Sequence, residues 1–431
     1  RQYMSHYPDV LGITWEQYIN LGKTNPNDPN EKFSMSVLAC NLSQEVNGVS
    51  WLHGEVSKEI LGNMWPGYFK NELHIGYVTN GVHFPTWIAS SLRRLYARYF
   101  GDGFEGHVYD SPAWQKVHDI PDAELWEERM KLKNKLIKHI RRRYSDPRQV
   151  RLDSPRQMLQ VIEGIKPDVL TIGFARRMVQ GVDVWLNTPT RPLEASGTSG
   201  EKCVMNGVLQ FSVLDGWWVE GYKEGAGWML PMERTFADQH YQDELDAEMI
   251  YNTIEEQIAP KYYARDTDGI PHEWVSSVKR CVADIASNFT TNRMLTDYEN
   301  RFYDKLAARK REMSAEAYRM AREIAAWKRK VSAAWDQVRI VDVQRVTVDM
   351  ANLRPEDIGV EMVVARQIVG GQSVNVTRTI QLERTKADGS RVTYSLDYTP
   401  DEAGTFDVAL RIYPSNPLLP HRMDFALVKW A

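Results

Sequence analysis

The chain has 431 residues, with 53 lysine and arginine side chains against 57 aspartate and glutamate side chains, so its net charge is −4. Hydrophobic residues make up 43% of the chain and charged residues 26%, which is typical of a folded globular protein and excludes a mainly disordered one. The near balance of charges argues against a general nucleic-acid-binding protein, which needs a basic surface.

Further classes are excluded by residue type and order. The three cysteines (Cys40, Cys203 and Cys281) are widely spaced, so we expect neither a disulfide scaffold nor a metal site, and a reducing, cytoplasmic location fits them. No apolar run approaches the roughly 20 residues that span a bilayer, and the first residues lack the apolar stretch of a signal peptide. The 14 tryptophans and 20 tyrosines fit either core packing or flat sugar-binding surfaces.

The first region, residues 1–165, combines short helices with loops. The stretch 33–61 predicts two helices separated by a break at Asn47-Gly48. The stretch 72–89, ELHIGYVTNGVHFPTWIA, predicts a strand that ends in a polar turn. Residues 123–144 predict an amphipathic helix, whose acidic start and basic end suit the helix dipole.

The second region, residues 166–337, alternates strands and helices. An apolar run over 167–177 ends in a basic turn, as at the carboxyl end of a buried parallel strand. Residues 194–217 predict a turn, a helix that stops at Asn206-Gly207, and a strand. A long charged helix over 312–335 closes the region. This alternation predicts an α/β domain with a mostly parallel sheet.

The third region, residues 338–431, changes to the alternating pattern of β-strands. The predicted strands are separated by turns such as Asp388-Gly389, and they cover 338–350, 359–369, 373–384, 391–400 and 404–414. This spacing predicts a small antiparallel β-sandwich.

The segment EASGTSGEK, residues 194–202, carries the most chemical information. Its two glycines permit close backbone approach, and its Thr-Ser pair can cap the following helix, whose first-turn N–H groups form an anion site. Lys202 lies in that turn, and an amine beside an anion site suits a Schiff base with a phosphorylated aldehyde. From the residues alone, a helix cap with a solvated lysine is the commoner interpretation.

The longer stretch EASGTSGEKCVMNGVLQFSVLDGWWVEGY closely resembles the cofactor-lysine segment of the α-glucan (glycogen/maltodextrin) phosphorylases. In that family the lysine of E-A-S-G-T-x-x-x-K carries pyridoxal phosphate, which implies that Lys202 is the cofactor lysine. Other segments resemble the family in the family's order, namely NGVSWLHGEVSKEIL, YVTNGVHFPTW, TIGFARR and NFTTNRMLTDYENRFY. The stretch LDGWWVEGY and the terminal PLLPHRMDFALVKW are most similar to the short bacterial-type branch.

The resemblance implies a glycosyltransferase that cleaves α-1,4-glucan with inorganic phosphate and releases glucose 1-phosphate, using pyridoxal phosphate. It implies that Gly197 and Thr198 lie beside the cofactor and donate to the substrate phosphate, with Arg177 as a charged clamp. His53 and His83 are interpreted as structural or substrate-lining, because no carboxylate partner is fixed by spacing.

The resemblance also implies a set of sugar-binding residues. These are Asn80 of the T-N-G-V turn together with Glu194, Ser196 and Gly197. For Glu194 a second interpretation stays open, because a carboxylate at the start of a helix is also stabilised by the helix dipole.

The implied fold is the glycosyltransferase type B arrangement of two Rossmann-like domains, both incomplete here, followed by the β-sandwich. Residues 1–165 would be the remainder of the N-terminal domain, 166–337 the C-terminal domain with the cofactor lysine, and 338–431 an accessory domain. That accessory domain either packs against the larger one or binds glucan. Homodimerisation is an expectation from the family.

The sequence departs from the family pattern in two places. Family members have further polypeptide before the position of this chain's first residue. In addition, their basic turn continues as A-R-R-F-x-T-Y-K-R, whereas here Arg177 is followed directly by M-V-Q-G-V-D, which normally lies several strands later. The lysine that contacts substrate phosphate is therefore missing, and an internal deletion is predicted near 177/178.

These departures keep a second hypothesis open, in which the chain is a non-catalytic remnant that binds glucan or a partner. A third, another pyridoxal-phosphate enzyme such as a transaminase, is disfavoured because its cofactor lysine is not expected within E-A-S-G-T-x-x-x-K beside a turn such as T-N-G-V. The activity of this particular chain is left open by the sequence.

Overall fold

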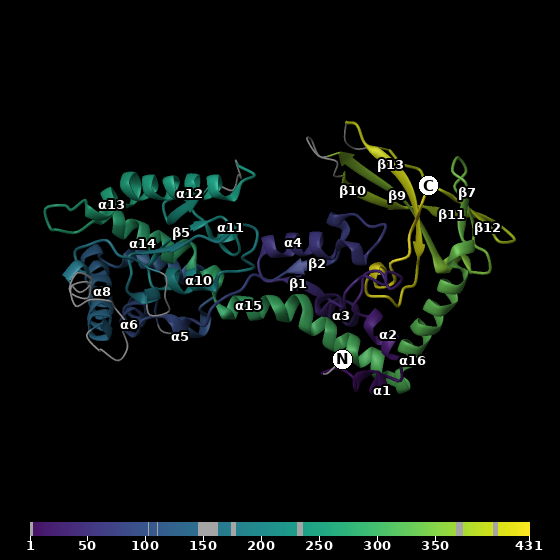
Figure 1. Cartoon of the computed structure of the whole chain (residues 1–431), viewed down its shortest axis with the longest axis horizontal. Helices are drawn as coiled ribbons and strands as arrows, with labels where there is room; N and C mark the ends of the chain where they lie inside the picture. The colour runs from purple at the N-terminus through teal and green to yellow at the C-terminus, as the bar shows by residue number, and fades with distance from the viewer. Residues whose placement is uncertain are drawn as a thin grey trace. The chain divides into compact units, whose positions relative to one another are not determined.

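The computed structural model describes residues 3–101, 103–109, 111–144, 163–173, 178–230, 236–367, 374–399 and 404–431. The chain forms two compact units (Figure 1). The first unit comprises Arg1–Asn47, Gly54–Gly76 and Arg301–Ala431, and the second comprises Gly48–His53 and Tyr77–Asn300. Residues 1–165 are thus divided between the two units, and residues 301–337 lie in the same unit as residues 338–431.

The second unit is built on a four-stranded parallel sheet in the order β3-β4-β5-β6, as the sequence predicts. Its strands are β3 (Ile172–Gly173), β4 (Val184–Asn187), β5 (Leu209–Val213) and β6 (Gly227–Leu230). The central strand β5 is almost wholly buried, because helices α10 and α14 pack on it. Its buried side chains include the apolar Leu209 and Phe211 and also the polar Gln210 and Ser212.

The helices of the second unit surround this sheet (Figure 1). In α14 the buried side chains recur at the three- and four-residue spacing of one helix face, from Trp274 through Val278 to Val282. The helices are α5 (Phe84–Trp87), α6 (Ser90–Phe100), α7 (Ser111–Gln115), α8 (Asp122–Tyr144), α10 (Thr198–Met205), α11 (Trp218–Gly221), α12 (Gln239–Thr253), α13 (Ala259–Tyr263), α14 (His272–Asp284) and α15 (Thr291–Tyr298).

Helix α8 anchors the start of β4 through two buried cations that lie one turn apart. Arg129 donates to the carbonyl oxygens of Gln180, Val182 and Asn206 at 2.5–2.8 Å. Lys133 donates to the Asp183 carboxylate at 2.5 Å. Removing either cation would leave buried acceptors without donors, so α8 fixes the segment that leads into the sheet.

The first unit contains two four-stranded antiparallel sheets, ordered β10-β9-β13-β14 and β11-β12-β8-β7 (Figure 1). Both sheets contribute to one core, which includes Val348, Val360, Val392 and Ile412, so they form the expected β-sandwich. The strands are β7 (Arg339–Asp342), β8 (Thr347–Asp349), β9 (Ile358–Gln367), β10 (Val374–Gln381), β11 (Glu383–Asp388), β12 (Arg391–Ser395), β13 (Asp407–Pro414) and β14 (Lys429–Trp430).

Two predicted strands of the sandwich are each divided in the structure. Residues 338–350 form the pair β7 and β8, because the chain turns at Val343–Val346 and lets Arg339 lie opposite Asp349. Residues 373–384 form β10 and the start of β11, which belong to different sheets. The alternation of apolar and polar residues continues through the turn in the first case and through the change of sheet in the second. The sequence pattern alone therefore did not reveal either break.

The remaining elements of the chain are shorter, apart from α16. Their bounds are α1 (Tyr7–Leu11), α2 (Trp15–Asn20), α3 (Met35–Leu42), β1 (Val46–Gly48), α4 (Trp51–Leu61), β2 (Ile75–Tyr77) and α16 (Asp304–Ala334). The predicted break at Asn47-Gly48 is thus a short strand, and it pairs with β2. The predicted helix over 312–335 is the larger part of α16, whose backbone is non-helical at Ala315–Tyr318.

Within the described residues, none of the helices combines the length and the apolar character that crossing a bilayer requires.

Candidate active site

Helix α10 (Thr198–Met205) carries Lys202 and begins in the predicted segment, but Thr198 and Ser199 are its first two residues and do not cap it. Gly197 precedes it with φ = +80°, a backbone conformation that favours glycine, and a Cβ atom there would lie 2.8 Å from Oε1 of Glu194. No side chain caps the first turn. The helix ends at Asn206, and Gly207 follows with φ = +67°. The N-terminal turn of α10 is therefore open to an external acceptor.

Lys202 is half-buried beside an aromatic ring. Its Nζ donates to Oγ1 of Thr198 at 3.4 Å and lies 4.3 Å from the centre of the Trp87 ring. No carboxylate forms an ion pair with Lys202 within the described ranges. Within the described ranges, the amine therefore has one long hydrogen bond and one aromatic contact.

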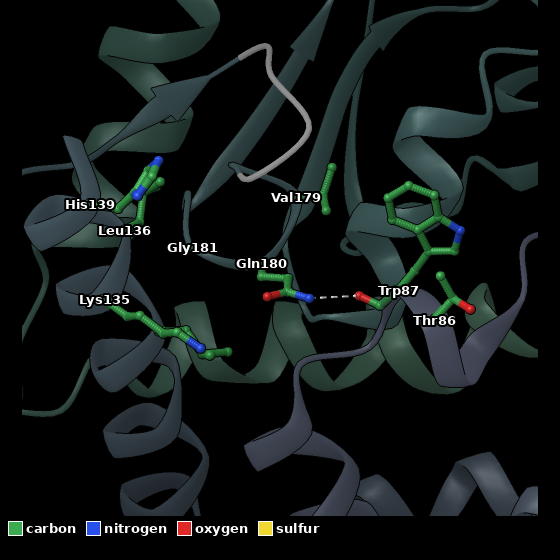
Figure 2. Close-up of a pocket in the computed structure, with 9 residues that line it drawn as sticks. Thr86, Trp87, Lys135, Leu136, His139, Val179, Gln180 and Gly181 are labelled. Atoms are coloured by element: carbon green, nitrogen blue, oxygen red, sulfur yellow. Dashed lines mark hydrogen bonds between the residues drawn. The ribbon is translucent and has the colours of Figure 1, made fainter. Parts of the chain in front are cut away.

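A cavity of about 550 Å³ adjoins Trp87. Figure 2 shows Lys135 and His139 of α8 on one side of this cavity and Trp87 on the opposite side, with Gln180 between them. Nε2 of Gln180 donates to the Trp87 carbonyl oxygen at 3.1 Å, drawn as the dashed line in Figure 2. Because the Trp87 ring both lines the cavity and faces Lys202, the amine and the cavity share one aromatic wall.

Glu194 is held at the opposite end of the same segment. Its backbone N–H donates to Oδ2 of Asp215 at 3.1 Å, and its Oε2 accepts from Nδ2 of Asn187 at 3.0 Å. These contacts direct the carboxylate toward Gly197, whose Cα it approaches closely. This places the carboxylate beside the N-terminus of α10, so the interpretation as a helix-start carboxylate stabilised by the dipole stays open.

The predicted sugar-binding turn lies in the same unit as the lysine helix. The Asn80 backbone N–H donates to the carbonyl oxygen of Val49 at 2.9 Å. The next residue, Ser50, donates from its hydroxyl to the carbonyl oxygen of Ala195 at 2.8 Å. The turn 48–51 thus connects Asn80 to the segment of Glu194, Ser196 and Gly197. These predicted residues are brought together, whereas Arg177 lies outside the described residues.

Four buried side chains around α10 have polar atoms that find no hydrogen-bond partner in the described part of the chain. They are Ser196, Glu201, Gln210 and Trp217. The Gln210 amide and the Trp217 ring both press against Gly200, where a Cβ atom would lie 2.6 Å from Oε1 of Gln210. Burial raises the pKa of Glu201 to about 8, against the smaller effects of Arg293 and Lys202. Each unsatisfied buried group of this kind calls for an explanation, such as strain, a catalytic role or a bound water or ion.

The second unit also holds two buried cysteines and the two histidines considered in the sequence. Burial raises the pKa of the Cys203 and Cys281 thiols, which keeps them protonated and unreactive. Nδ1 of His53 accepts from the backbone N–H of Val49 at 3.1 Å, a structural role, and His83 contacts Oγ1 of Thr86 at 2.7 Å. No group of three or more metal-ligating side chains occurs among the residues that the structure describes.

Sequence reasoning missed Trp87 as a neighbour of Lys202, and it missed Gln180 and Lys135 as residues that line the cavity. Trp87 stands within the quoted segment YVTNGVHFPTW, seven residues after Asn80, so its proximity to a predicted sugar-binding turn was a usable signal. Gln180 and Lys135 lie in segments without such a signal, because their positions depend on how α8 packs.

An α/β unit that places a half-buried lysine and an aromatic side chain beside a mainly apolar cavity with a few polar groups defines a candidate enzyme site. Comparisons with known proteins are more specific. Residues 335–431 match the family model described as the glycogen phosphorylase C-terminal domain. The chain is 39% identical over 378 residues to the glycogen phosphorylase of Aquifex aeolicus, which covers 69% of this chain and 53% of that protein.

Two further relatives match nearly the whole chain. The maltodextrin phosphorylase of Thermococcus litoralis is 30% identical over 502 residues, covering 97% of this chain and 59% of that protein. The glycogen phosphorylase of Mycobacterium tuberculosis is 29% identical over 513 residues, with the same two coverages of 97% and 59%. The chain belongs to the α-glucan phosphorylase family, as its motifs predict.

The chain spans only 53–59% of the length of these relatives. The alignment with the Thermococcus litoralis protein is longer than the chain itself, so at least 502 − 431 = 71 aligned positions have no residue here. At least part of the missing length is therefore internal to the alignment.

Proposed function

We propose that the second unit carries the reaction centre of an α-glucan phosphorylase, which transfers a terminal glucose of α-1,4-glucan to inorganic phosphate and forms glucose 1-phosphate. The observation that carries this proposal is the placement of Lys202 on a helix whose open first turn is flanked by Gly197 and Glu194. A reactive amine, an anion site and a sugar-directed carboxylate then occupy one segment of nine residues.

Pyridoxal phosphate is the cofactor that these residues fit. Lys202 supplies an amine without a carboxylate partner in the described ranges, and Trp87 supplies a flat face 4.3 Å from that amine. The adjoining cavity of about 550 Å³ offers the Lys135 ammonium for an anionic group. When bound, such a cofactor supplies a phosphate group that can exchange a proton with the substrate phosphate.

The residues of the chain would divide the remaining work between phosphate and sugar. The first-turn N–H groups of α10 and the Thr198 hydroxyl donate to the substrate phosphate, and Arg177 adds a positive charge that offsets the repulsion between two phosphates. Glu194 accepts from glucose hydroxyl groups, while Asn80 and the backbone of Ser196 and Gly197 hold the same ring. Lys202 anchors the cofactor.

The fold of the whole enzyme would be the glycosyltransferase type B arrangement, of which this chain holds parts of both domains. We place an internal deletion after Arg177. Only residues 174–183 connect the parallel strands β3 and β4, whereas a crossover between parallel strands usually needs a dozen or more residues. The at least 71 aligned positions without a residue here agree with missing internal polypeptide.

This shortened connection supports a second candidate function, a non-catalytic remnant that binds glucan. Both candidates retain Glu194 and Asn80 as sugar-binding residues, but only the enzyme requires glucose 1-phosphate release. A cytoplasmic location and a homodimer are carried over from the family as further proposals.

The proposal is tested by labelling the protein with pyridoxal phosphate, reducing it with borohydride and mapping the peptides. We expect the label on Lys202 and its loss in Lys202→Arg, which keeps the positive charge but cannot be labelled in the same way. A folded protein whose Lys202 stays unlabelled would contradict the cofactor assignment. Release of glucose 1-phosphate from maltodextrin and phosphate distinguishes the enzyme from the remnant.

A further inference from the structure

The T-N-G-V turn has no regular secondary structure around Asn80, yet its backbone is fixed on every side. Gly81 packs so closely that a Cβ atom would lie 2.3 Å from the carbonyl oxygen of Thr290. Val82 then forms a parallel bridge with Thr290, donating to the Phe289 carbonyl oxygen at 2.8 Å. The turn is therefore held by contacts from distant parts of the chain.

One arginine holds the first half of the turn. Nη2 of Arg293 donates to the carbonyl oxygens of Thr79 at 2.7 Å and Asn80 at 3.0 Å. The other donors of the same guanidinium are bound by Asp297 at 2.9 Å and by the carbonyl oxygen of Asn288 at 2.7 Å. The guanidinium of Arg293 is planar, and Asp297 and Asn288 hold it from α15 and from just before that helix. It therefore has little freedom to rotate away from the turn.

One carboxylate joins the turn to a second segment. Oε2 of Glu220 accepts from the hydroxyl of Thr79 at 2.7 Å, and Oε1 accepts from the backbone N–H of Trp51 at 2.8 Å. Thr79 is itself buried, so this charge-assisted bond is shielded from competing solvent. Glu220 thereby ties residues 51 and 79 to helix α11.

The segment that ends in Glu220 also holds the other predicted sugar-binding residue. Asp215 accepts from the Glu194 backbone N–H at 3.1 Å, and the Trp217 backbone N–H donates to the Ser196 carbonyl oxygen at 2.9 Å. Residues 215–220 therefore contact Glu194 at one end and the turn at the other. A rigid spacer of six residues connects the two candidate sugar ligands.

The Asn80 side chain is left available by this arrangement. Its backbone N–H and carbonyl oxygen are bound by Val49 and Arg293. Its carboxamide makes no hydrogen bond to any residue that the structure describes, and it is half-buried. The backbone contacts thus fix the position of Asn80, while its carboxamide stays available to a ligand.

We propose that Glu220 and Arg293 are positioning residues, which hold Asn80 at a fixed place relative to Glu194 so that both side chains reach one glucose ring. This inference rests on the proposed function for its ligand. Neither residue needs to touch the sugar, since both act through the backbone and hydroxyl groups of the turn.

The experiment combines two readouts in the full chain, namely amide hydrogen exchange of residues 77–83 without ligand and the dissociation constant for maltoheptaose. We expect Glu220→Ala and Thr79→Val to accelerate exchange in the turn and to weaken maltoheptaose binding about tenfold. Borohydride labelling of Lys202 should be unchanged in both variants, because the lysine does not depend on the turn.

The conservative variants Glu220→Gln and Thr79→Ser retain the bridging hydrogen bonds and should keep both readouts within about twofold of the original. Glu224→Ala is the matched control, since Glu224 is exposed on the same segment. The inference is overturned if Glu220→Ala leaves exchange in the turn unchanged, or accelerates it without weakening maltoheptaose binding. If the original chain binds no maltoheptaose, the proposed function fails, and the exchange data still decide whether Glu220 fixes the turn.

Discussion

The ammonium group of Lys202 lies 4.3 Å from the centre of the Trp87 ring, although the two residues come from segments far apart in the sequence. Asn206 holds them together. Its Nδ2 donates to the carbonyl oxygens of Trp87 at 2.9 Å and Lys202 at 2.8 Å, and its Oδ1 accepts from the Ala89 backbone N–H at 2.8 Å. One buried amide thus ends the lysine helix and fixes the aromatic wall opposite the amine.

Replacing Trp87 by leucine should weaken cofactor binding. A cation over an aromatic face contributes about 0.5–2 kcal/mol, so we expect the dissociation constant for pyridoxal phosphate to rise by a few-fold to about thirtyfold. Absorbance titration of the Lys202 imine measures this constant. Trp228→Leu is the control, because Trp228 is a half-buried tryptophan of the same unit without contact to Lys202. An equal rise of the dissociation constant in both variants would contradict a specific role of Trp87.

The immediate surroundings of Lys202 could be predicted because their determinants are local. Gly197 before the helix, the Asn206-Gly207 stop after it and the apolar strand behind it stand in one short segment. Trp87 and Glu220 could not be assigned in the same way. Their partners Asn206 and Thr79 lie 119 and 141 residues away, so the contacts depend on tertiary packing that no local pattern encodes.

Glu201 should make the stability of the second unit depend on pH. Burial raises the pKa of its carboxyl from 4.5 to about 8 in the folded state. Between these values the folded state binds more protons than the unfolded state, so the free energy of unfolding falls as pH rises, by up to about 1.4 kcal/mol per pH unit. Glu201→Gln should remove this slope, while the exposed Glu224→Gln should keep it. Urea denaturation at pH 5–9 measures the difference, and parallel curves for the original and Glu201→Gln would contradict it.

Arg411 should be essential to the first unit. It is fully buried and donates to Glu361 at 2.7 Å and to Glu72 at 2.8 Å, while Arg422 adds a second donor to Glu361 at 2.7 Å. Removing one partner of a buried ion pair leaves a buried charge, which costs about 3–5 kcal/mol. Arg411→Met should therefore lower the midpoint of thermal unfolding markedly, whereas Arg384→Met, at an exposed site on β11, should not. Similar midpoints for the two variants would show that the cluster contributes little.

The last prediction concerns the connection after Arg177. In the family the basic turn continues as Y-K-R, and its lysine contacts substrate phosphate, so a chain without it lacks one of the charges that hold two phosphates close together. We expect this chain to release little or no glucose 1-phosphate from maltodextrin and phosphate, even with pyridoxal phosphate bound to Lys202. Inserting the corresponding segment of the Aquifex aeolicus relative between Arg177 and Met178 should restore release.

The same segment inserted at Gly389, in the exposed turn between β11 and β12, is the control for length alone. It should leave the chain inactive, since the added charges would belong to the first unit, whereas Lys202 and Thr198 belong to the second. Robust turnover by the original chain would show instead that its own residues complete the phosphate site. Because labelling of Lys202 is measured in every variant, loss of the cofactor is separated from loss of the phosphate ligand.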